Sequence, residues 1–556
     1  MSFLNAVTPW SATVQEDLQN SGILFELERS GYRYQIQNTG NSIWCVVRWP
    51  AGGSIAFRLA YGMNGIFDDP EITEENDGLL IKAATRLATY RINLTFPDSQ
   101  RTVFRFTTTF NVRFSMLIPF WPRDIVPITE DGRVENTAGK IHALQEGGRS
   151  GQLFFSYTKP KTGSVFYFQN LSAMSPYCEM SETILTNSVG GSWPEIGFQF
   201  PVNKDKPIPA NKDYVINDAF VFLSEELPEQ DYDICQQYLD FLSAVYLMLP
   251  KPEIKYTDWI NIAESALENL DHNKGCWRLV DGSPYLTAYL GDYKTPSEIM
   301  VQLAVLLPLR EYLDWKGEEH RIYAELRDGL NIFYDDHLKT IVRWHPSLND
   351  ELDNSEEQKQ VMVMDSWYLH HPLLNLARLA LNGDKNAEKL FLDSIEYAMR
   401  VAHHFKYEWP VFYRMTTLEI LKAETGPGKG GEKDVPGSYA HIMLMAWKIT
   451  GEKRYLAEAA KAVKLLGGLA FDIFYQANNT AFTAAALVEM YKESNDDYYL
   501  KLSYCCLAGV FRNVHIWDCG YGYGKHFPSF FAVYPLKDAP YTAAYEELEV
   551  YAALSY

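Results

Sequence analysis

Apolar and polar positions alternate with a period of two in the first part of the chain. Between residues 103 and 118, Phe104, Phe106 and Phe110 share one parity with the other apolar side chains, and Arg105 and Thr107 share the opposite one. Because successive side chains of a strand point to opposite faces, the pattern predicts one long strand with one buried face. Shorter alternating runs fill residues 1–225 and are separated by Gly, Pro, Asn and Asp. Together they predict an antiparallel β-sandwich over residues 1–228.

After Pro228 the apolar positions recur with the 3.6-residue period of a helix. The chain therefore belongs to the α+β multidomain class, with a linker and first helix over 229–256 and an (α/α)6 toroid of helical hairpins over 257–556. The expected helices are 230–249, 257–271, 297–315 with 318–334, 366–381 with 385–404, 438–449 with 452–466, 479–492 with 497–512, and 541–554.

The connections between these helices differ in length. Within a pair they are a few residues long, whereas those between pairs cover 272–296, 336–365, 405–437, 467–478 and 513–540. In a closed ring of hairpins the long connections lie on one rim. Long loops in a compact domain usually carry function, so the pattern predicts a site there.

Charge and composition reduce the number of possible functions. The net charge of −21 excludes a nucleic-acid partner, because phosphate binding needs a basic surface. No apolar run is long enough for a bilayer span, which predicts no membrane partner. The first residues show neither a basic nor an apolar leader region, and the seven scattered cysteines do not form a disulfide framework. Both features favour a cytoplasmic protein, and the oligomeric state stays open.

The predicted long loops are rich in aromatic residues and carboxylates. Flat aromatic rings stack on the C–H faces of sugars, and carboxylates bind hydroxyls or move protons. The sequence therefore predicts a carbohydrate cleft and an oligosaccharide substrate. The candidate substrate-binding residues are Trp277, Tyr293, Trp344, His345, Trp367, Trp409, Tyr439, Trp517 and His526.

The order of a β-sandwich followed by a helical toroid resembles the six-hairpin glycosidase group. The segment LMAWKITGEKRYLAEAAKAV, residues 444–463, is similar to the inner-helix, Thr-Gly turn, outer-helix unit of such toroids. The resemblance concerns the architecture, and no family-specific catalytic motif matches. It implies an inverting glycoside hydrolase, or a disaccharide phosphorylase.

Inverting cleavage needs two carboxyl groups about 6.5–9.5 Å apart, one as acid and one as base. Asp365 precedes Ser-Trp at a helix start, where it is also a good N-cap. Glu408 lies between Tyr407 and Trp409, although a solvated loop position would explain it too. Asp292 could be a turn residue, and Asp518 lies in a loop rich in Gly and Tyr. These four are the candidate catalytic residues.

Other chemistries stay open. A uronate lyase or epimerase would use Tyr or His as base and a cation to neutralise the substrate, from the set Tyr368, His370, Tyr439, Arg343, His345, Lys525 and His526. A non-catalytic sugar-binding protein is a further alternative. The Gly-rich segment 426–434 lacks the order of a P-loop, although a phosphorylase could use Lys429, Lys433 or Arg414. The Cys and His spacings match no zinc site, so neither a metal nor a cofactor is predicted.

Overall fold

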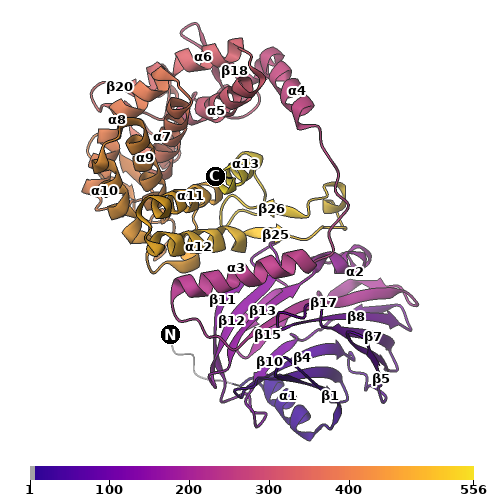
Figure 1. Cartoon of the computed structure of the whole chain (residues 1–556). Helices are drawn as coiled ribbons and strands as arrows, with labels where there is room; N and C mark the ends of the chain where they lie inside the picture. The colour runs from indigo at the N-terminus through magenta and orange to yellow at the C-terminus, as the bar shows by residue number, and fades with distance from the viewer. Residues whose placement is uncertain (1–6, 556) are drawn as a thin grey trace. The chain divides into compact units, whose positions relative to one another are not determined.

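The structure is a computed structural model that describes residues 7–555, and its chain divides into two compact units (Figure 1). The first unit takes the chain up to residue 253 and adds residues 511–534 and 538–543. The second unit takes residues 254–510, 535–537 and the residues from 544 to the end. The model is thus of mixed α and β type, and each unit has its own type of secondary structure.

The first unit contains two large antiparallel sheets. One has the strand order β1-β2-β3-β4-β10-β15-β14 and the other the order β11-β12-β13-β17-β8-β7-β6-β5. The first sheet comprises β1 (Ile23–Arg29), β2 (Tyr32–Asn38), β3 (Ser42–Arg48), β4 (Ser54–Tyr61), β10 (Ile125–Ile128), β15 (Glu195–Phe198) and β14 (Val189–Ser192). The second comprises β11 (Ala138–Leu144), β12 (Gly151–Lys159), β13 (Gly163–Gln169), β17 (Asp213–Ser224), β8 (Val103–Val112), β7 (Ala88–Thr95), β6 (Gly78–Ala84) and β5 (Glu71–Glu75).

Residues of both sheets share one hydrophobic core. Phe57 of β4 and Phe104 of β8 meet edge to face with ring centroids 5.3 Å apart. The strand expected over residues 103–118 is shorter than the pattern indicates. β8 ends at Val112, and residues 116–118 form β9 (Met116–Ile118), which pairs with β16 (Asn203–Ile208) instead. The partner strand β17 begins at Asp213, opposite Asn111, and on the other edge β7 pairs with β8 only from Ala88, opposite Val112.

Helices and a returning segment complete the first unit. Helix α3 (Asp231–Met248) packs Phe241 against Phe166 of β13, with ring centroids 6.0 Å apart. Helices α1 (Pro9–Asn20) and α2 (Ser175–Ser181) and the hairpin of β25 (Val514–Ile516) and β26 (Phe531–Val533) also belong to it. This unit therefore includes residues that lie inside the range 257–556 predicted as helical.

The second unit is built from paired helices. Five inner helices form a series in which each contacts its neighbours in the series. They are α5 (Ile299–Lys316), α7 (Ser366–Leu381), α9 (Val435–Thr450), α11 (Ala477–Ser494) and α13 (Ala544–Leu554). Outer helices cover them, namely α6 (Arg321–Gly329) on α5, α8 (Lys385–His404) on α7 and α10 (Lys453–Ala462) on α9. Helix α4 (Trp259–His272) precedes this arrangement, and α12 (Asp497–Arg512) follows α11. The helices predicted at 366–381 and 385–404 are confirmed.

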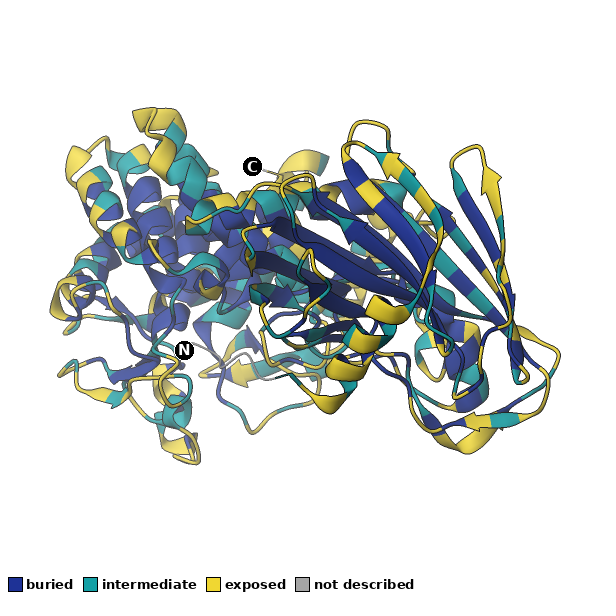
Figure 2. Ribbon diagram, turned by 90° about the horizontal axis from the view of Figure 1, so that it is seen from below, coloured by how far each residue is buried: buried dark blue, intermediate teal, exposed yellow. Residues whose placement is uncertain are grey.

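Burial distinguishes inner from outer helices, as Figure 2 shows. Almost every residue of α7 is buried, because neighbouring helices cover it on several sides. The outer helix α8 buries only one stripe and exposes charged residues on the opposite face. No helix in the described part of the chain is long and apolar enough to cross a membrane.

Short strands stiffen the long loops that lead into the inner helices. β18 (Trp277–Val280) and β19 (Ser283–Leu286) form a hairpin before α5, and β20 (Tyr334–Asp335) pairs with β21 (Thr340–Ile341). Strands β22 (Val363–Asp365), β23 (Phe412–Arg414) and β24 (Ile420–Lys422) form a three-stranded sheet. This sheet joins the loop before α7 to the loop before α9.

Candidate active site

The N-terminal ends of four inner helices meet through side-chain contacts. The Tyr368 hydroxyl at the start of α7 donates to Glu298, the residue before α5, at 2.7 Å. Asp434, the residue before α9, accepts the backbone N–H of Gln476 before α11 at 3.0 Å. The residues before these helices therefore share one end of the helical unit, where partly exposed N–H groups favour negative charge.

Asp365 and Glu432 form a carboxyl pair at this end. Asp365 is the N-cap of α7 and accepts the backbone N–H of Tyr368 at 3.1 Å. The Glu432 side chain accepts the N–H of Trp367 at 2.6 Å and is hydrogen-bonded to Asp365. Two carboxyls can share a hydrogen bond only if one holds a proton. Part of Asp365 stays accessible, whereas Glu432 is only 2% exposed.

The pair has raised pKa values for physical reasons. Burial raises the pKa of Glu432 well above its usual range, and the nearby Asp365 and Asp434 carboxyls raise it further. Burial also raises the pKa of Asp365, against the lowering effect of Arg343 and of backbone N–H donors. Their mutual hydrogen bond lowers the pKa of Asp365 and raises that of Glu432, so Glu432 is the member that holds its proton more tightly.

A close backbone approach fixes the position of Glu432. A Cβ atom on the preceding Gly431 would lie 2.0 Å from the carbonyl oxygen of Trp409. Only glycine fits there, so the Gly-rich loop before α9 can press against the loop that follows α8. This contact, rather than phosphate binding, accounts for one glycine of the segment 426–434.

Asp434 is fully buried beside the pair. Its Oδ2 atom accepts the Gln476 N–H and the Thr480 hydroxyl, the latter at 2.8 Å. Burial raises its pKa to about 6. Because both hydrogen bonds reach the same oxygen and tie α9 to α11, this carboxyl has a structural role.

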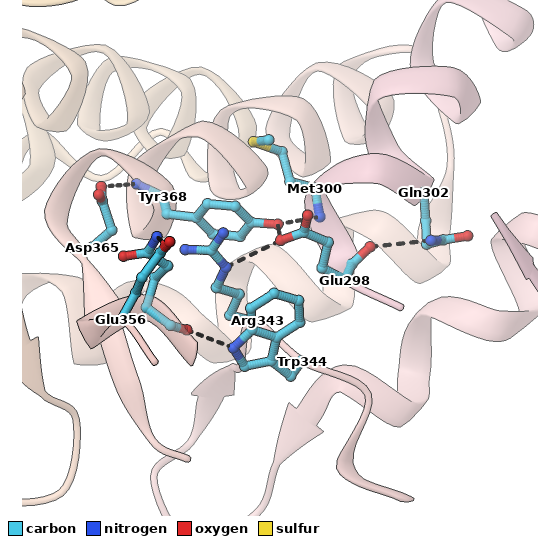
Figure 3. Close-up of polar contacts among 9 residues, drawn as sticks. Glu298, Met300, Gln302, Arg343, Trp344, Glu356, Asp365 and Tyr368 are labelled. Atoms are coloured by element: carbon cyan, nitrogen blue, oxygen red, sulfur yellow. Dashed lines mark hydrogen bonds and ion pairs between the residues drawn. The ribbon is translucent and has the colours of Figure 1, made fainter. Parts of the chain in front are cut away.

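Glu298 has different partners from Asp365 (Figure 3). Its Oε2 atom accepts both the Tyr368 hydroxyl and Arg343 Nε, the latter at 3.0 Å. The Arg343 guanidinium lies over the Tyr368 ring at 4.1 Å, and in Figure 3 it lies between Asp365 and Glu298. Burial lowers the pKa of Arg343, but the Glu298 and Asp365 charges outweigh it and the net pKa is raised. Arg343 thus stays charged and makes a charge-assisted hydrogen bond to Glu298.

Aromatic side chains line the start of α7. Trp344 packs against the Arg343 guanidinium at 4.7 Å and donates its indole N–H to the Gln358 carbonyl. Trp367 and Trp409 are buried, and among the described residues their indole nitrogens have no hydrogen-bond partner. Tyr439 instead points to the outer helix α10, where its hydroxyl donates to Glu458 at 3.2 Å. Trp344 and Trp367 therefore contact the groups around the carboxyls, whereas the Trp409 ring packs against Tyr439 with centroids 5.2 Å apart.

A second polar cluster connects α7, α11 and α13. Glu549 accepts hydrogen bonds from His371 at 2.9 Å, from Asn478 at 2.6 Å and from the Tyr545 hydroxyl at 2.8 Å. Burial raises the pKa of Glu549, but His371 and the other donors outweigh it and the net pKa is lowered. The Trp367 ring packs against His371 with centroids 5.0 Å apart. This cluster therefore positions the Trp367 ring, whereas Glu432 holds the Trp367 backbone N–H.

The structure places the other predicted catalytic residues elsewhere. Glu408 is exposed in the turn after α8, and its backbone N–H bonds to Phe405. Asp292 closes a turn through Thr295 and the N–H of Lys294, and these hydrogen bonds lower its pKa. Asp518 belongs to the first unit, where its N–H bonds to Ser172.

The remaining predicted binding residues are also distributed. Trp277 bonds to the Leu270 carbonyl, and Tyr293 is 53% exposed. His345 is buried against Tyr285 and Phe333. Trp517 and His526 belong to the first unit, and Trp517 donates to the Gly148 carbonyl there. These residues stay predictions as ligand contacts.

Two acidic residues of the site were not among the four predicted catalytic carboxylates. Glu298 follows Pro296 at a helix start, where the helix dipole alone would explain it. Glu432 follows two glycines just before the buried helix α9, and that spacing was the available signal. Within residues 7–555 no group of three or more His, Cys, Asp and Glu side chains could hold a metal ion.

Comparisons with known proteins were made for the sequence and for the structure. No protein-family model and no curated protein sequence matches the chain. Among solved structures, a sugar epimerase from a ruminal bacterium matches at 12% identity and a TM-score of 0.39, over 60% of this chain and 89% of its own. A family 76 glycoside hydrolase from a bovine Bacteroides thetaiotaomicron strain matches at 9% identity and 0.34, over 76% and 99%. A polysaccharide lyase matches at 9% identity and 0.32, over 96% and 98%.

The three similar structures are an epimerase, a hydrolase and a lyase. The chemistry of this chain depends on its own side chains.

Proposed function

We propose that the helical unit is an inverting glycoside hydrolase acting on an oligosaccharide, with Asp365 as the general acid and Glu298 as the general base. One observation carries the proposal. Two acidic residues precede adjacent inner helices, and one has a carboxyl partner, Glu432, whereas the other has a guanidinium partner, Arg343. Pairs of titratable groups with such opposed environments are typical of acid and base assignments.

The acid role rests on the pair with Glu432. In the loaded state protonated Glu432 donates a hydrogen bond to one Asp365 oxygen, and the other Asp365 oxygen carries the proton that is transferred. Asp365 passes this proton to the glycosidic oxygen as the bond to the anomeric carbon breaks. The carboxylate left behind is stabilised by the Glu432 hydroxyl, the Tyr368 N–H and the Arg343 charge.

The base role rests on the hydrogen bonds of Glu298. Both recorded donors, Tyr368 and Arg343, reach its Oε2 atom, so Oε1 can accept a proton from water. Inverting chemistry needs the two carboxyl groups about 6.5–9.5 Å apart, with room between them for the attacking water. Arg343 acts on both of them, through a 3.0 Å contact with Glu298 and a charge that lowers the pKa of Asp365.

A uronate lyase or epimerase is the second candidate, because Arg343 lies beside Tyr368 and could neutralise a carboxylate. Two features disfavour it. The Tyr368 hydroxyl already donates to Glu298, and burial raises its pKa well above 10. His370 is fully buried, and burial lowers its pKa to about 4. Neither side chain is therefore a ready base for a substrate C–H group.

The experiment is a screen of neutral oligosaccharides and uronate polymers with product analysis. Hydrolysis raises the amount of reducing ends, gives the inverted anomer by early-time NMR and forms no ultraviolet chromophore. It also proceeds in phosphate-free buffer, which separates it from phosphorolysis. An unsaturated, ultraviolet-absorbing product from a uronate substrate would reject hydrolysis. The lack of any product would favour a non-catalytic sugar-binding protein.

A further inference from the structure

The first unit has a cavity of its own, with a volume of about 490 Å³. It lies between the start of α1, residues 120–123 and the β14–β15 hairpin, and its principal lining residues are Trp10, Phe120, Arg123, Trp193, Glu195 and Gln199. The volume is within the range of ligand pockets in proteins. We infer that this cavity is a second carbohydrate site, which binds a neutral oligosaccharide chain independently of the proposed hydrolase activity.

Trp193 forms a rigid aromatic wall. Its ring occupies the space beside Gly139, where a Cβ atom would lie 2.1 Å from it. It packs against Tyr157 with centroids 5.4 Å apart, and its indole N–H donates to the Thr137 hydroxyl at 3.0 Å. The ring is thus fixed before any ligand arrives, which lowers the entropy cost of binding.

Two further rings come from other segments. Trp10 lies over the Arg58 guanidinium at 4.9 Å, at the first turn of α1. Phe120 is 55% exposed, and its ring meets Tyr61 edge to face with centroids 6.3 Å apart. Core packing does not account for a phenylalanine this exposed on the wall of a cavity. Three rings around one cavity offer stacking surfaces for the apolar faces of sugar rings.

The polar groups of the cavity suit hydroxyls. Arg123 is anchored through its Nη1 atom on the Gly197 carbonyl at 2.7 Å, so its guanidinium is held at the cavity. Gln199 donates to the Trp121 carbonyl at 3.0 Å, which leaves its amide oxygen as an acceptor. Glu195 adds an acceptor and balances the charge of Arg123. One positive and one negative group favour a neutral ligand over a polyanion.

A wider groove in the same unit lacks these features. It has a volume of about 770 Å³ and crosses the sheet of β5 to β8. Its two aromatic lining residues, Tyr90 and Phe110, are at most 3% exposed because they face the core. Its walls carry charges of both signs and threonines, without a stacking surface. The smaller aromatic cavity is therefore the better sugar site.

The test is calorimetric titration of the full-length Asp365→Asn protein with cellohexaose, mannohexaose and maltohexaose, and with a galacturonate oligomer as the anionic comparison. We expect at least one neutral hexaose to bind at millimolar concentration or below. Phe120→Ala and Trp193→Ala should each weaken this binding by about tenfold or more, and Trp193→Phe should restore part of it. In the active enzyme, Phe120→Ala should leave the turnover of a short substrate unchanged.

The matched control is Phe114→Ala, because Phe114 is also an exposed phenylalanine, at 57%, and is not among the residues that line the cavity. It should bind like the parent protein. If Trp193→Ala unfolds, the surface variant Phe120→Ala still decides the question. Equal affinities in parent, Phe120→Ala and Phe114→Ala would overturn the inference, as would tighter binding of the galacturonate oligomer or no binding of any hexaose. If the protein binds a hexaose at this cavity but hydrolyses none of the oligosaccharides, that result would contradict the proposed function alone.

Discussion

Asp365 and Glu298 occupy equivalent positions in the helical unit but have different partners. Each directly precedes an inner helix, α7 or α5. Asp365 is paired with a second carboxyl group, Glu432, whereas Glu298 is paired with the Arg343 guanidinium. Burial raises the pKa of Asp365, whereas the hydrogen bond with Glu432 and the charge of Arg343 lower it. The same position in the fold can therefore receive a carboxyl partner or a guanidinium partner, and the neighbouring loop decides which.

Removing the titrating carboxyl of Asp365 should have the largest effect. Asp365→Asn should lower kcat on an oligosaccharide by about 10²–10⁴, as expected for loss of a general acid. Asparagine caps a helix as well as aspartate does, so stability should change little. The matched control is Asp258→Asn, because Asp258 caps α4 through the N–H of Asn261. Steady-state kinetics and thermal melts check both, and a wild-type kcat in Asp365→Asn would remove Asp365 from the mechanism.

Neutralising Glu298 should have the next largest effect. Glu298→Gln keeps the shape of the side chain and removes its ability to accept a proton, so kcat should fall by about 10² or more. Glu408→Gln separates this assignment from one in which Glu408, a candidate from the sequence, works with Asp365 as the acid/base pair. Because Glu408 is exposed, our proposal expects it to stay close to wild type. The reverse result, a large loss in Glu408→Gln alone, would restore the sequence-based pair.

Replacing Glu432 should have a smaller effect on turnover. A glutamine at this position can still accept the Trp367 N–H and donate to Asp365, as the protonated carboxyl does. Glu432→Gln should therefore change kcat by less than about tenfold at neutral pH. The pH–rate profile is the measurement. A loss as large as that of Asp365→Asn would show that Glu432 itself exchanges a proton during turnover.

The smallest expected effect is on stability, and it comes from replacing Asp434. Burial raises its pKa to about 6, so its proton favours the folded state at low pH. This contribution is complete below about pH 4 and is lost as the pH rises through about 6, at a cost of about 1–3 kcal/mol. Asp434→Asn cannot titrate, so its free energy of unfolding should fall less over this range. Urea melts at several pH values measure it, and parallel curves for variant and wild type would refute the assignment.

Periodicity predicted much of the fold. The helices at 366–381 and 385–404 have the predicted bounds, because their apolar positions lie within the helices and their N-caps, Asp365 and Asp384, directly precede them. The prediction of one long strand over 103–118 was wrong, because the end of β8 depends on its partner β17, which is about a hundred residues away in the sequence. Likewise, the packing of α3 and of residues 511–534 in the first unit depends on contacts that local periodicity does not contain.

The site was less predictable for a related reason. Asp365 was found because an aspartate before a buried helix is visible in the sequence. Its partner Glu432 is 67 positions later, and their hydrogen bond exists only because the sheet of β22 and β23 joins the two loops. Glu408 had a suitable aromatic neighbourhood in the sequence, but the turn after α8 exposes its side chain. The residue types are therefore visible in the sequence, whereas the pairing is not, because its two members lie far apart along the chain.

The central claim is that Asp365 donates a proton to the leaving group while Glu298 activates water. The direct measurement compares two substrates of the sugar that the screen identifies, an oligosaccharide and the matching glycosyl fluoride. Fluoride leaves without a proton, so Asp365→Asn should lose about 10² or more in kcat/KM on the oligosaccharide and keep most activity on the fluoride. Glu298→Gln should lose activity on both. Equal losses on the two substrates in Asp365→Asn would contradict the account.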